Sequence, residues 1–303
     1  MTRVMRSVPA LLLAGLMAAN LAAGLGREAR AQTPAAEIHR VQGTTYVPSF
    51  DRKRPIFILV LGSDARPGEK VNRLHADSIH IVAVNPREGG GTIVGFPRDS
   101  WVTLPGRGET RINDAMVYGG PKLAVETVES ITNIPIDYYM LTSFPGLVKM
   151  VKRVGGLPIT IPYRMQDESS GANFKPGKTR LNGDEALAFA RDRHSTPGGD
   201  FGRSENQGRL MIAALTKLRK TSENGPTVLL RWIEAGLANM ETDLSLVEVF
   251  DLAATATQID PENVKNVVVP GAPTMINDAS VVLISGAAQE IYDDVRDDGL
   301  LNG

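Results

Sequence analysis

Two aspartates stand in short loops beside predicted strands. Asp64 follows the aliphatic run 56–61, and Asp77 immediately precedes the run 78–84. Sites in α/β sheets form outside the carboxyl ends of strands, so these two carboxylates can share one hard cation there. Mg²⁺ typically takes one or two carboxylates together with phosphate oxygens. A single aspartate in such a loop is more often a turn former, and the pair by itself leaves both interpretations open.

Arginines recur near this pair and in two later segments. A guanidinium group binds phosphate oxygens through two parallel hydrogen bonds and keeps its charge at any working pH. Each arginine alone has a simpler interpretation, an ion pair with a neighbouring surface acid. Several arginines with a metal and no evident nucleophile favour phosphoryl transfer, which depends mainly on positioning and charge stabilisation. The arginines concerned are Arg66, Arg98, Arg191, Arg193 and Arg203.

The spacing of these side chains decides which of them can converge. Residues two apart on a helix do not face the same way, whereas residues two apart on extended chain do. Arg191 and Arg193 therefore converge only if their helix ends near Phe189, and the proline and glycines that follow favour this ending. Gln207 lies four residues after Arg203 and shares its face of the next helix.

Several other function classes lack their signatures. The net charge of −1 provides no global basic field for nucleic acid. The absence of cysteine excludes thiol chemistry, disulfides and cysteine-based zinc sites. There is no Walker-type loop, Gly-x-Ser-x-Gly elbow or His-Glu-x-x-His helix. Four histidines lack metal-ligand spacing, although His75 and His194 each lie inside a candidate motif; the four are His39, His75, His80 and His194.

Hydrophobic runs of strand length alternate with segments of helical spacing, which predicts a three-layer α/β domain. Helices are expected to begin near Pro121 and at Ser143. A third helix is expected after Asn182, which forms a capping box with Glu185, and a fourth is expected to be capped by Asp200. Strands are expected at 56–61, 78–84, 92–96, 136–141, 157–161 and 267–269.

The chain divides into four predicted segments. A basic start, an uncharged Ala/Leu/Gly run and Ala29-Arg30-Ala31 make residues 1–31 a secretory signal peptide or an uncleaved signal anchor. The remainder is therefore expected outside the cytoplasm, either secreted or at the outer face of the membrane. The other segments are a linker at 32–54, a catalytic domain at 55–220 and an extension packed on the same domain at 221–303. Within the catalytic domain, the polar, glycine-rich stretch 163–180 is expected to be a long surface loop.

Nine motifs in order give the chain a resemblance to the LytR-CpsA-Psr family over roughly residues 55–218. Any one of them would be weak evidence, but their order makes the resemblance specific. They are Leu61-Gly62-Ser63-Asp64-Ala65-Arg66, Ala76-Asp77-Ser78, Pro97-Arg98-Asp99, Arg111-Ile112-Asn113-Asp114-Ala115, Tyr118-Gly119-Gly120, Gly155-Gly156-Leu157, Leu181-Asn182-Gly183-Asp184-Glu185-Ala186-Leu187, Arg191-Asp192-Arg193 and Asp200-Phe201-Gly202-Arg203.

The resemblance implies an extracytoplasmic enzyme that moves a glycopolymer from a polyprenyl pyrophosphate carrier to peptidoglycan. It implies an α/β/α sandwich with a mixed central sheet and a hydrophobic pocket for the polyprenyl chain. Asp64 and Asp77 would hold the metal, for which we expect Mg²⁺. As a separate mechanistic hypothesis, Asp99 or Asp64 assists removal of the proton from the acceptor hydroxyl. The pyrophosphate would be held by Arg98, Arg191, Arg193 and Arg203, with Arg66 and Gln207 in the same site.

Two departures from the family pattern bear on these expectations. His75 stands where the family commonly has arginine, and a neutral histidine cannot make the same always-charged contact, although Arg73 is a candidate substitute. A cleaved leader would also remove the membrane anchor that relatives usually keep. Two alternatives stay open, a pyrophosphohydrolase that uses water as the acceptor and a non-catalytic wall-binding protein. The glycopolymer itself, teichoic acid, arabinogalactan or capsule, is not specified by the sequence.

Overall fold

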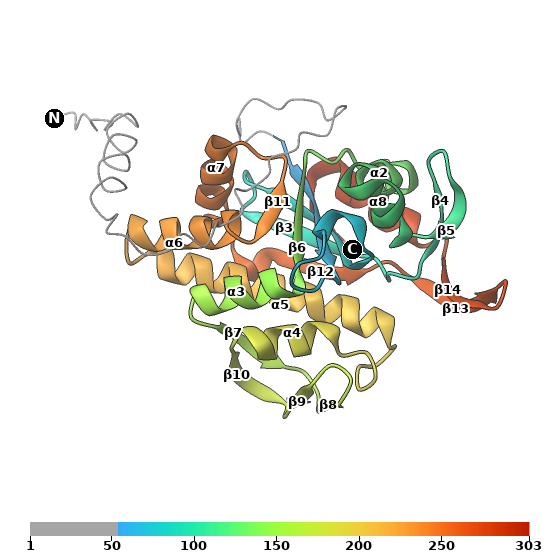
Figure 1. Cartoon of the computed structure of the whole chain (residues 1–303). Coiled ribbons are helices and arrows are strands. Elements are labelled where there is room, and N and C mark those ends of the chain that lie inside the picture. The colour runs from blue at the N-terminus through green and yellow to red at the C-terminus, as the bar shows by residue number, and fades with distance from the viewer. Residues whose placement is uncertain (1–53, 303) are drawn as a thin grey trace. The chain divides into compact units, whose positions relative to one another are not determined.

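The computed structural model describes residues 54–302. The predicted leader, 1–31, and nearly all of the predicted linker, 32–54, lie outside the described residues. Within the described range, no helix is both long enough and apolar enough to span a bilayer. The predicted α/β architecture is confirmed, with helices on both faces of a mixed sheet (Figure 1).

The central sheet has the strand order β11-β6-β1-β2-β3-β12. Strand β1 pairs antiparallel with β2 and parallel with β6, and β3 pairs parallel with β12. The aliphatic runs become central strands because helices cover both faces of the sheet. The strands are β1 (Ile56–Ser63), β2 (Ala76–Asn85), β3 (Gly90–Gly95), β6 (Tyr138–Ser143), β11 (Met240–Thr242) and β12 (Val264–Val268). Both edge strands, β11 and β12, come from the segment after residue 220.

One face of the sheet, called here the filled face, packs against α2 (Asp114–Thr132) and α8 (Ala288–Asp298). Because successive side chains on a strand alternate between faces, Phe57, Leu59 and Leu61 of β1 all point to this side. Each is at most 2% exposed and belongs to the same core cluster as residues of α2 and α8. This face is a close-packed core.

The opposite face, called here the hollow face, carries the alternate residues of the same strands. It is covered by α3 (Phe144–Arg153), α5 (Asp200–Ser222), α6 (Pro226–Leu237) and α7 (Leu246–Ala256), while α4 (Gly183–Arg191) packs against α3 and α5 (Figure 1). Val60, Val82 and Met140 lie on this face and are only partly buried. Apolar residues on both sides of one strand therefore meet two different environments.

The helix expected near Pro121 begins earlier than predicted, at Asp114. Gly120 interrupts the helical backbone with φ +66°, a left-handed value that glycine adopts without steric cost. Pro121 then starts a second helical segment, where a missing N–H is tolerated. The prediction described this second segment and missed the first turns.

The stretch 163–180 is not the long loop that was expected. It contains β8 (Met165–Asp167), β9 (Ala172–Phe174) and β10 (Gly177–Leu181), and β10 pairs with β7 (Leu157–Ile161). The strands are short and largely polar, so they carry little hydrophobic periodicity. The remaining strands form two hairpins, β4 (Trp101–Leu104) with β5 (Gly108–Arg111) and β13 (Gly271–Ile276) with β14 (Ala279–Ile284).

Two predicted helix caps had different outcomes. The capping box of Asn182 and Glu185 at the start of α4 is confirmed, with both reciprocal hydrogen bonds present. At α5 the cap residue is Gly199 instead of Asp200, which is the first helical residue. The Asp200 carboxylate is directed elsewhere, to Arg98 and Arg203.

Candidate functional site

A cavity of about 740 Å³ lies between the hollow face of the sheet and the helices that cover it. Most of its lining is apolar and comes from β1, β2, β6, α3, α5, α6 and α7. Methionine is well represented, and its flexible side chain adapts to irregular ligands. Representative lining residues are Val60, Val82, Met140, Met150, Leu210 and Trp232.

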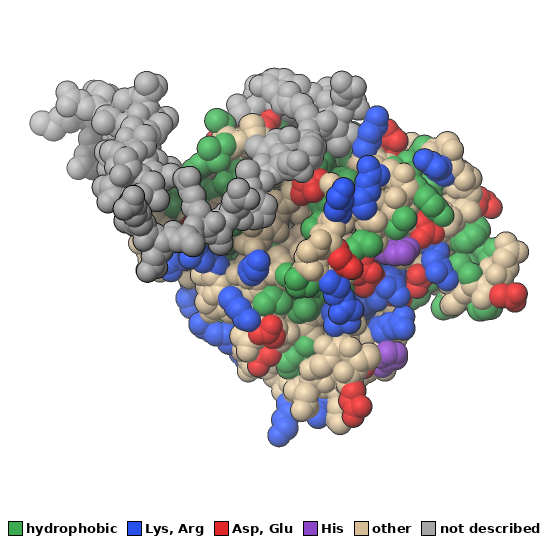
Figure 2. Space-filling model, viewed as in Figure 1, with side chains coloured by type: hydrophobic (Ala, Val, Ile, Leu, Met, Phe, Trp, Pro, Cys, Tyr) green, Lys and Arg blue, Asp and Glu red, His purple; other side chains and the backbone are tan. Residues whose placement is uncertain are grey.

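The same cavity also has a cluster of charged and amide side chains, called here the polar end. These residues come from the start of β2, the turn after β3, the end of α4 and the loop that follows it, and the first turns of α5, which meet at one edge of the sheet. Figure 2 shows Lys and Arg side chains interspersed with Asp, Glu and His side chains on this face of the molecule. The polar end comprises Asp77, Arg98, Arg191, Arg193, His194, Arg203 and Gln207.

A β-bulge presents Asp77 at the polar end. Gly62 of β1 pairs with Ser78, but the next residue, Ser63, pairs with Ala76, so Asp77 is the extra residue in β2. A bulge of this kind re-aims a side chain and is frequent beside functional sites. The predicted position of Asp77 at a strand end is thus refined to an unpaired position inside β2.

Arg98 connects three acidic groups. Its Nη1 donates to Asp77 Oδ1 at 2.6 Å, and its backbone N–H donates to Asp200 Oδ2 at 2.9 Å. The guanidinium Nε lies 3.7 Å from Asp99 Oδ2. Burial opposes the charge on Arg98, but Asp77, Asp99 and Asp200 together raise its pKa above the ordinary value. Arg98 is therefore a fixed cation whose Nε has no hydrogen-bond partner among the described residues.

Arg203 is the most deeply buried cation of the cluster, with a side chain only 6% exposed. It forms an ion pair with Asp200 Oδ1 one helical turn earlier on α5. Burial lowers the pKa of Arg203 and raises the pKa of Asp200, so each charge depends on its partner. The spacing of four residues predicted that Arg203 and Gln207 share one face of the helix. Both side chains line the cavity, as this predicts.

Gln207 ties the elements of the polar end together. Its amide Nε2 donates to the backbone carbonyl of Asp77 at 3.2 Å and to that of Ala190 at 3.1 Å. It thereby joins the start of β2 to the last turn of α4. These two hydrogen bonds fix the backbone of β2 beside Asp77 relative to the end of α4 that carries Arg191.

Arg191 and Arg193 both line the cavity, although the helix does not end where the sequence predicted. Helix α4 continues to Arg191 and Asp192 is its C-cap, with extended backbone angles. The two arginines therefore meet across a helix terminus, with the extended Asp192 between them. The Arg191 guanidinium lies 5.1 Å from the centroid of the Phe144 ring, a cation–π contact that orients it.

Asp64 follows β1, and its backbone N–H donates to the carbonyl of His75 at 3.2 Å. Its Oδ1 is buried and has no hydrogen-bond partner among the described residues. Burial, and secondarily the charge of Asp77, raise the pKa of Asp64. A buried, unsatisfied carboxylate oxygen beside a second carboxylate is a donor set that fits a hard divalent cation. No cluster of three or more potential metal-ligating side chains is found among residues 54–302.

Three other predicted or suspected residues lie around this core. Asp99 is held between Arg98 and Arg111, whose Nε atoms are each 3.7 Å from its carboxylate. Arg66 is exposed and does not line the cavity; its backbone N–H binds Glu69. His75 pairs with Asp114 at 3.2 Å and is not among the cavity-lining residues.

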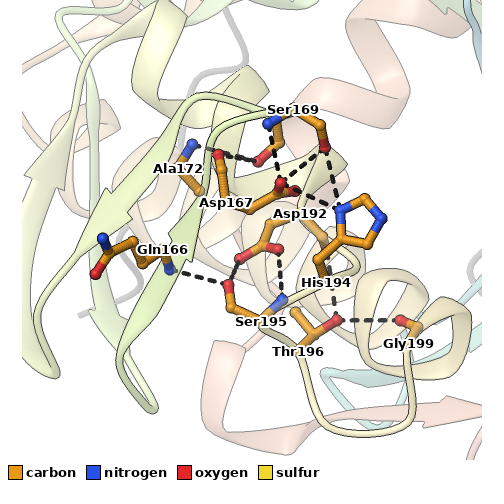
Figure 3. Close-up of polar contacts among 10 residues, drawn as sticks. Gln166, Asp167, Ser169, Ala172, Asp192, His194, Ser195, Thr196 and Gly199 are labelled. Carbon is orange, nitrogen blue, oxygen red and sulfur yellow. Dashed lines mark hydrogen bonds and ion pairs between the residues drawn. The ribbon is translucent and has the colours of Figure 1, made fainter.

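The sequence did not reveal a second polar network beside the arginines, shown in Figure 3. The loop after α4, which carries Arg193, is joined to the β8–β9 hairpin through Asp167, Ser169 and His194. Its acidic member, Asp167, lies in the stretch that was expected to be a long surface loop, so no local pattern linked it to the arginine motif. The cation–π partner Phe144 and the cavity wall from α6 and α7 were likewise not identified.

The family model described as the LytR_cpsA_psr family matches residues 22–295. The chain belongs to the LytR-CpsA-Psr family. A curated family relative from Enterococcus faecalis, named polyisoprenyl-teichoic acid–peptidoglycan teichoic acid transferase TagU, is 33% identical over 206 residues, which is 68% of this chain and 67% of the relative. The resemblance inferred from nine ordered motifs is confirmed.

Solved structures of other proteins show the same fold. Protein gbs0355 from Streptococcus agalactiae superposes with a TM-score of 0.71 at 24% identity, covering 84% of this chain and 92% of that one. The family protein YwtF (TagT), solved with a bound octaprenyl pyrophosphate lipid, gives a TM-score of 0.65 at 22% identity and covers 84% of this chain and 94% of that one. At these identities the likeness establishes the architecture.

Proposed function

We propose that this chain transfers a glycopolymer, of the teichoic acid type, from a polyprenyl pyrophosphate carrier to peptidoglycan outside the cytoplasm. The observation that carries the proposal is an apolar cavity with four arginines at one end, Arg98, Arg191, Arg193 and Arg203. Its two parts match the two parts of the donor, an apolar chain and a pyrophosphate. The name of the TagU relative, to which the chain is 33% identical over 206 residues, supports this substrate class.

In this proposal the arginines neutralise the pyrophosphate and hold it in line with the acceptor hydroxyl. Guanidinium donors are worth most where charge builds up on the transferred phosphoryl group. Gln207 keeps the arginine-bearing elements in register through its two backbone contacts. Arg66 is exposed beyond the cavity, so the proposal gives it at most a peripheral role with the donor headgroup.

Mg²⁺ is proposed as the cofactor, held by Asp64 and Asp77. When bound, the ion would offset the negative charge of both carboxylates and of the phosphate oxygens. The buried, unsatisfied Oδ1 of Asp64 supports a cation at this position. Asp77 Oδ1 accepts a hydrogen bond from Arg98 Nη1, which would hold the carboxylate fixed while the ion binds.

The experiment combines the protein, a defined polyprenyl-pyrophosphate-linked glycan, Mg²⁺ and peptidoglycan, and measures two products. Release of polyprenyl phosphate together with glycan covalently attached to peptidoglycan supports the transferase. Polyprenyl phosphate with free glycan phosphate would instead indicate a pyrophosphohydrolase. Binding of the donor without either product would indicate a wall-binding protein. An EDTA-treated sample tests the Mg²⁺ requirement in the same assay.

A further inference from the structure

His194 occupies a distinctive position at the polar end of the cavity. It follows Arg193 in the loop after α4, and its side chain is 56% exposed. Ser169 and Ser170, at the tip of the β8–β9 hairpin, line the cavity beside it. The imidazole is therefore accessible from the side of the cavity where the arginines gather.

The hydrogen bonds of His194 fix its tautomer. Nδ1 lies 3.1 Å from Asp167 Oδ1 and 3.1 Å from Ser169 Oγ, and the Ser169 hydroxyl itself donates to Asp167 Oδ1 at 2.7 Å. Both acceptors require the proton of the neutral ring to be on Nδ1. The lone pair is consequently on Nε2, which points away from Asp167 in Figure 3 and has no hydrogen-bond partner among the described residues.

Asp167 is suited to keep this arrangement. Its side chain is 5% exposed, and burial opposes its charge. Hydrogen bonds from Ser169 and His194 nevertheless hold the pKa of Asp167 well below its ordinary value, so it is a carboxylate throughout the physiological range. A buried carboxylate behind Nδ1 orients an imidazole and stabilises the imidazolium that forms when Nε2 takes a proton.

The loop does not need the imidazole to stay in place. Ser195 Oγ accepts from the backbone N–H of Gln166 at 3.0 Å and donates to the Asp192 carboxylate. Thr196 Oγ1 donates to the carbonyl of Gly199 at 3.1 Å (Figure 3). The contacts of Asp192, Ser195 and Thr196 already fasten the loop to β8 and to the start of α5, which leaves His194 available for chemistry.

We propose that Nε2 of His194 accepts the proton of the acceptor sugar hydroxyl during transfer. This inference rests on the proposed function. The hydroxyl oxygen forms a bond to the phosphorus on the glycan side, and the bond from that phosphorus to the bridging oxygen breaks. Polyprenyl phosphate leaves with the electron pair, and the hydroxyl proton moves to Nε2, giving an imidazolium paired with Asp167.

His194 is better placed for this role than the two carboxylates suggested by the sequence. Asp99 faces the Nε atoms of Arg98 and Arg111 and does not line the cavity. Asp64 is assigned to the cation in the proposed function. His194 alone of the three combines an open acceptor atom with a position on the cavity lining.

Two variants separate proton transfer from a structural role. In His194→Asn the amide nitrogen occupies the place of Nδ1 and keeps the bond to Asp167, but the side chain cannot take a proton. We expect kcat for glycan transfer to fall about 10²-fold or more, with the KM and the Kd for the lipid donor within about threefold of wild type. In His194→Ala, added imidazole is expected to restore part of the lost rate.

The outcomes are distinct. Transfer at the wild-type rate by His194→Asn, or a rate loss in His194→Ala that imidazole leaves unchanged, would overturn the role of His194 while the transferase proposal stands on the wild-type reaction. A wild-type protein that forms no glycan–peptidoglycan product with the donor would overturn both. A thermal unfolding curve of each variant checks that the fold is intact.

Discussion

The two faces of the central sheet carry apolar side chains from the same strands, yet only one of them is filled. Leu59 on the filled face is fully buried, whereas its neighbour Val60 on the hollow face lines a cavity of about 740 Å³. Close packing normally removes voids of this size, because unfilled space forfeits both hydrophobic and dispersion stabilisation. The contrast indicates that the filled face supplies stability and that the hollow face is kept open for a ligand.

The polar end sharpens this contrast. The arginines lie at one end of the cavity on the hollow face. The core on the filled face, by contrast, contains apolar side chains of β1, α2 and α8. The hollow face also accepts buried polar groups such as His80, which bonds to Ser78 and Ser204. Loss of function and loss of stability are therefore expected to separate by face.

The largest expected effect comes from removing a charge at the polar end. Arg98→Gln should lower the transfer rate about 10²–10³-fold, because one preorganised cation on the transferred phosphoryl group is lost. Lys122→Gln is the matched control, because it also removes one positive charge but at an exposed position on α2, where Lys122 forms an ion pair with Glu126. Steady-state rates of polyprenyl phosphate release measure both. Equal rates for the two variants would contradict the assignment of phosphoryl transfer to the polar end of the hollow face.

The second prediction concerns acid stability and the buried His80. Burial lowers the pKa of His80 to about 4, so the unfolded chain binds more protons than the folded one between that value and the ordinary pKa of about 6.5. Stability should therefore decrease as pH falls through this window, by up to about 3 kcal/mol from this group.

His80→Gln is the variant that tests this contribution. Its amide can still donate to the carbonyl of Ser204 but does not titrate, so the free energy of unfolding should vary less with pH between about 6.5 and 4 than in wild type. Urea titrations at several pH values measure the difference. Identical pH profiles for variant and wild type would show that the hollow-face histidine is not the acid-sensitive group.

A smaller effect is expected from adding volume at adjacent positions on opposite faces. Ala83 is 1% exposed in the filled core, and Ala83→Phe should destabilise the protein by about 1–3 kcal/mol or more through overpacking. Val82 lines the cavity, so Val82→Phe should change the free energy of unfolding by less than about 1 kcal/mol while weakening binding of the lipid donor. Chemical denaturation and donor titration of both variants check the pair. Similar destabilisation by both would mean that the cavity is not free space.

The sequence predicted the parts of this molecule that are encoded locally. The strands β1, β2 and β3 were predicted from continuous aliphatic runs, and the capping box at Asn182 was predicted from residues three apart. The order of the arginine motifs along the chain supported the family resemblance. What it did not predict depends on long-range packing. The Asp167–His194 contact joins residues 27 apart across a stretch with no clear periodicity. Helix α4 also ends at Arg191, two residues beyond the expected Phe189.

The cavity illustrates the same limit. Val60 and Leu59 are equally hydrophobic in the sequence, and period-2 alternation assigns them to opposite faces without saying which face is filled. That difference arises from how α3, α5, α6 and α7 are held away from the strands. Only the family resemblance suggested that the strand and helix faces would enclose a lipid pocket.

The central claim, that the hollow face receives an apolar chain while the arginines hold its pyrophosphate, is tested most directly by chain length. The measurement is the Kd of the wild-type protein for a series of prenyl pyrophosphates with increasing numbers of isoprene units. The account predicts that Kd falls with each added unit until the cavity is full and then levels off, and that Val82→Phe reaches this plateau at a shorter chain. The same Kd for short and long chains would contradict it.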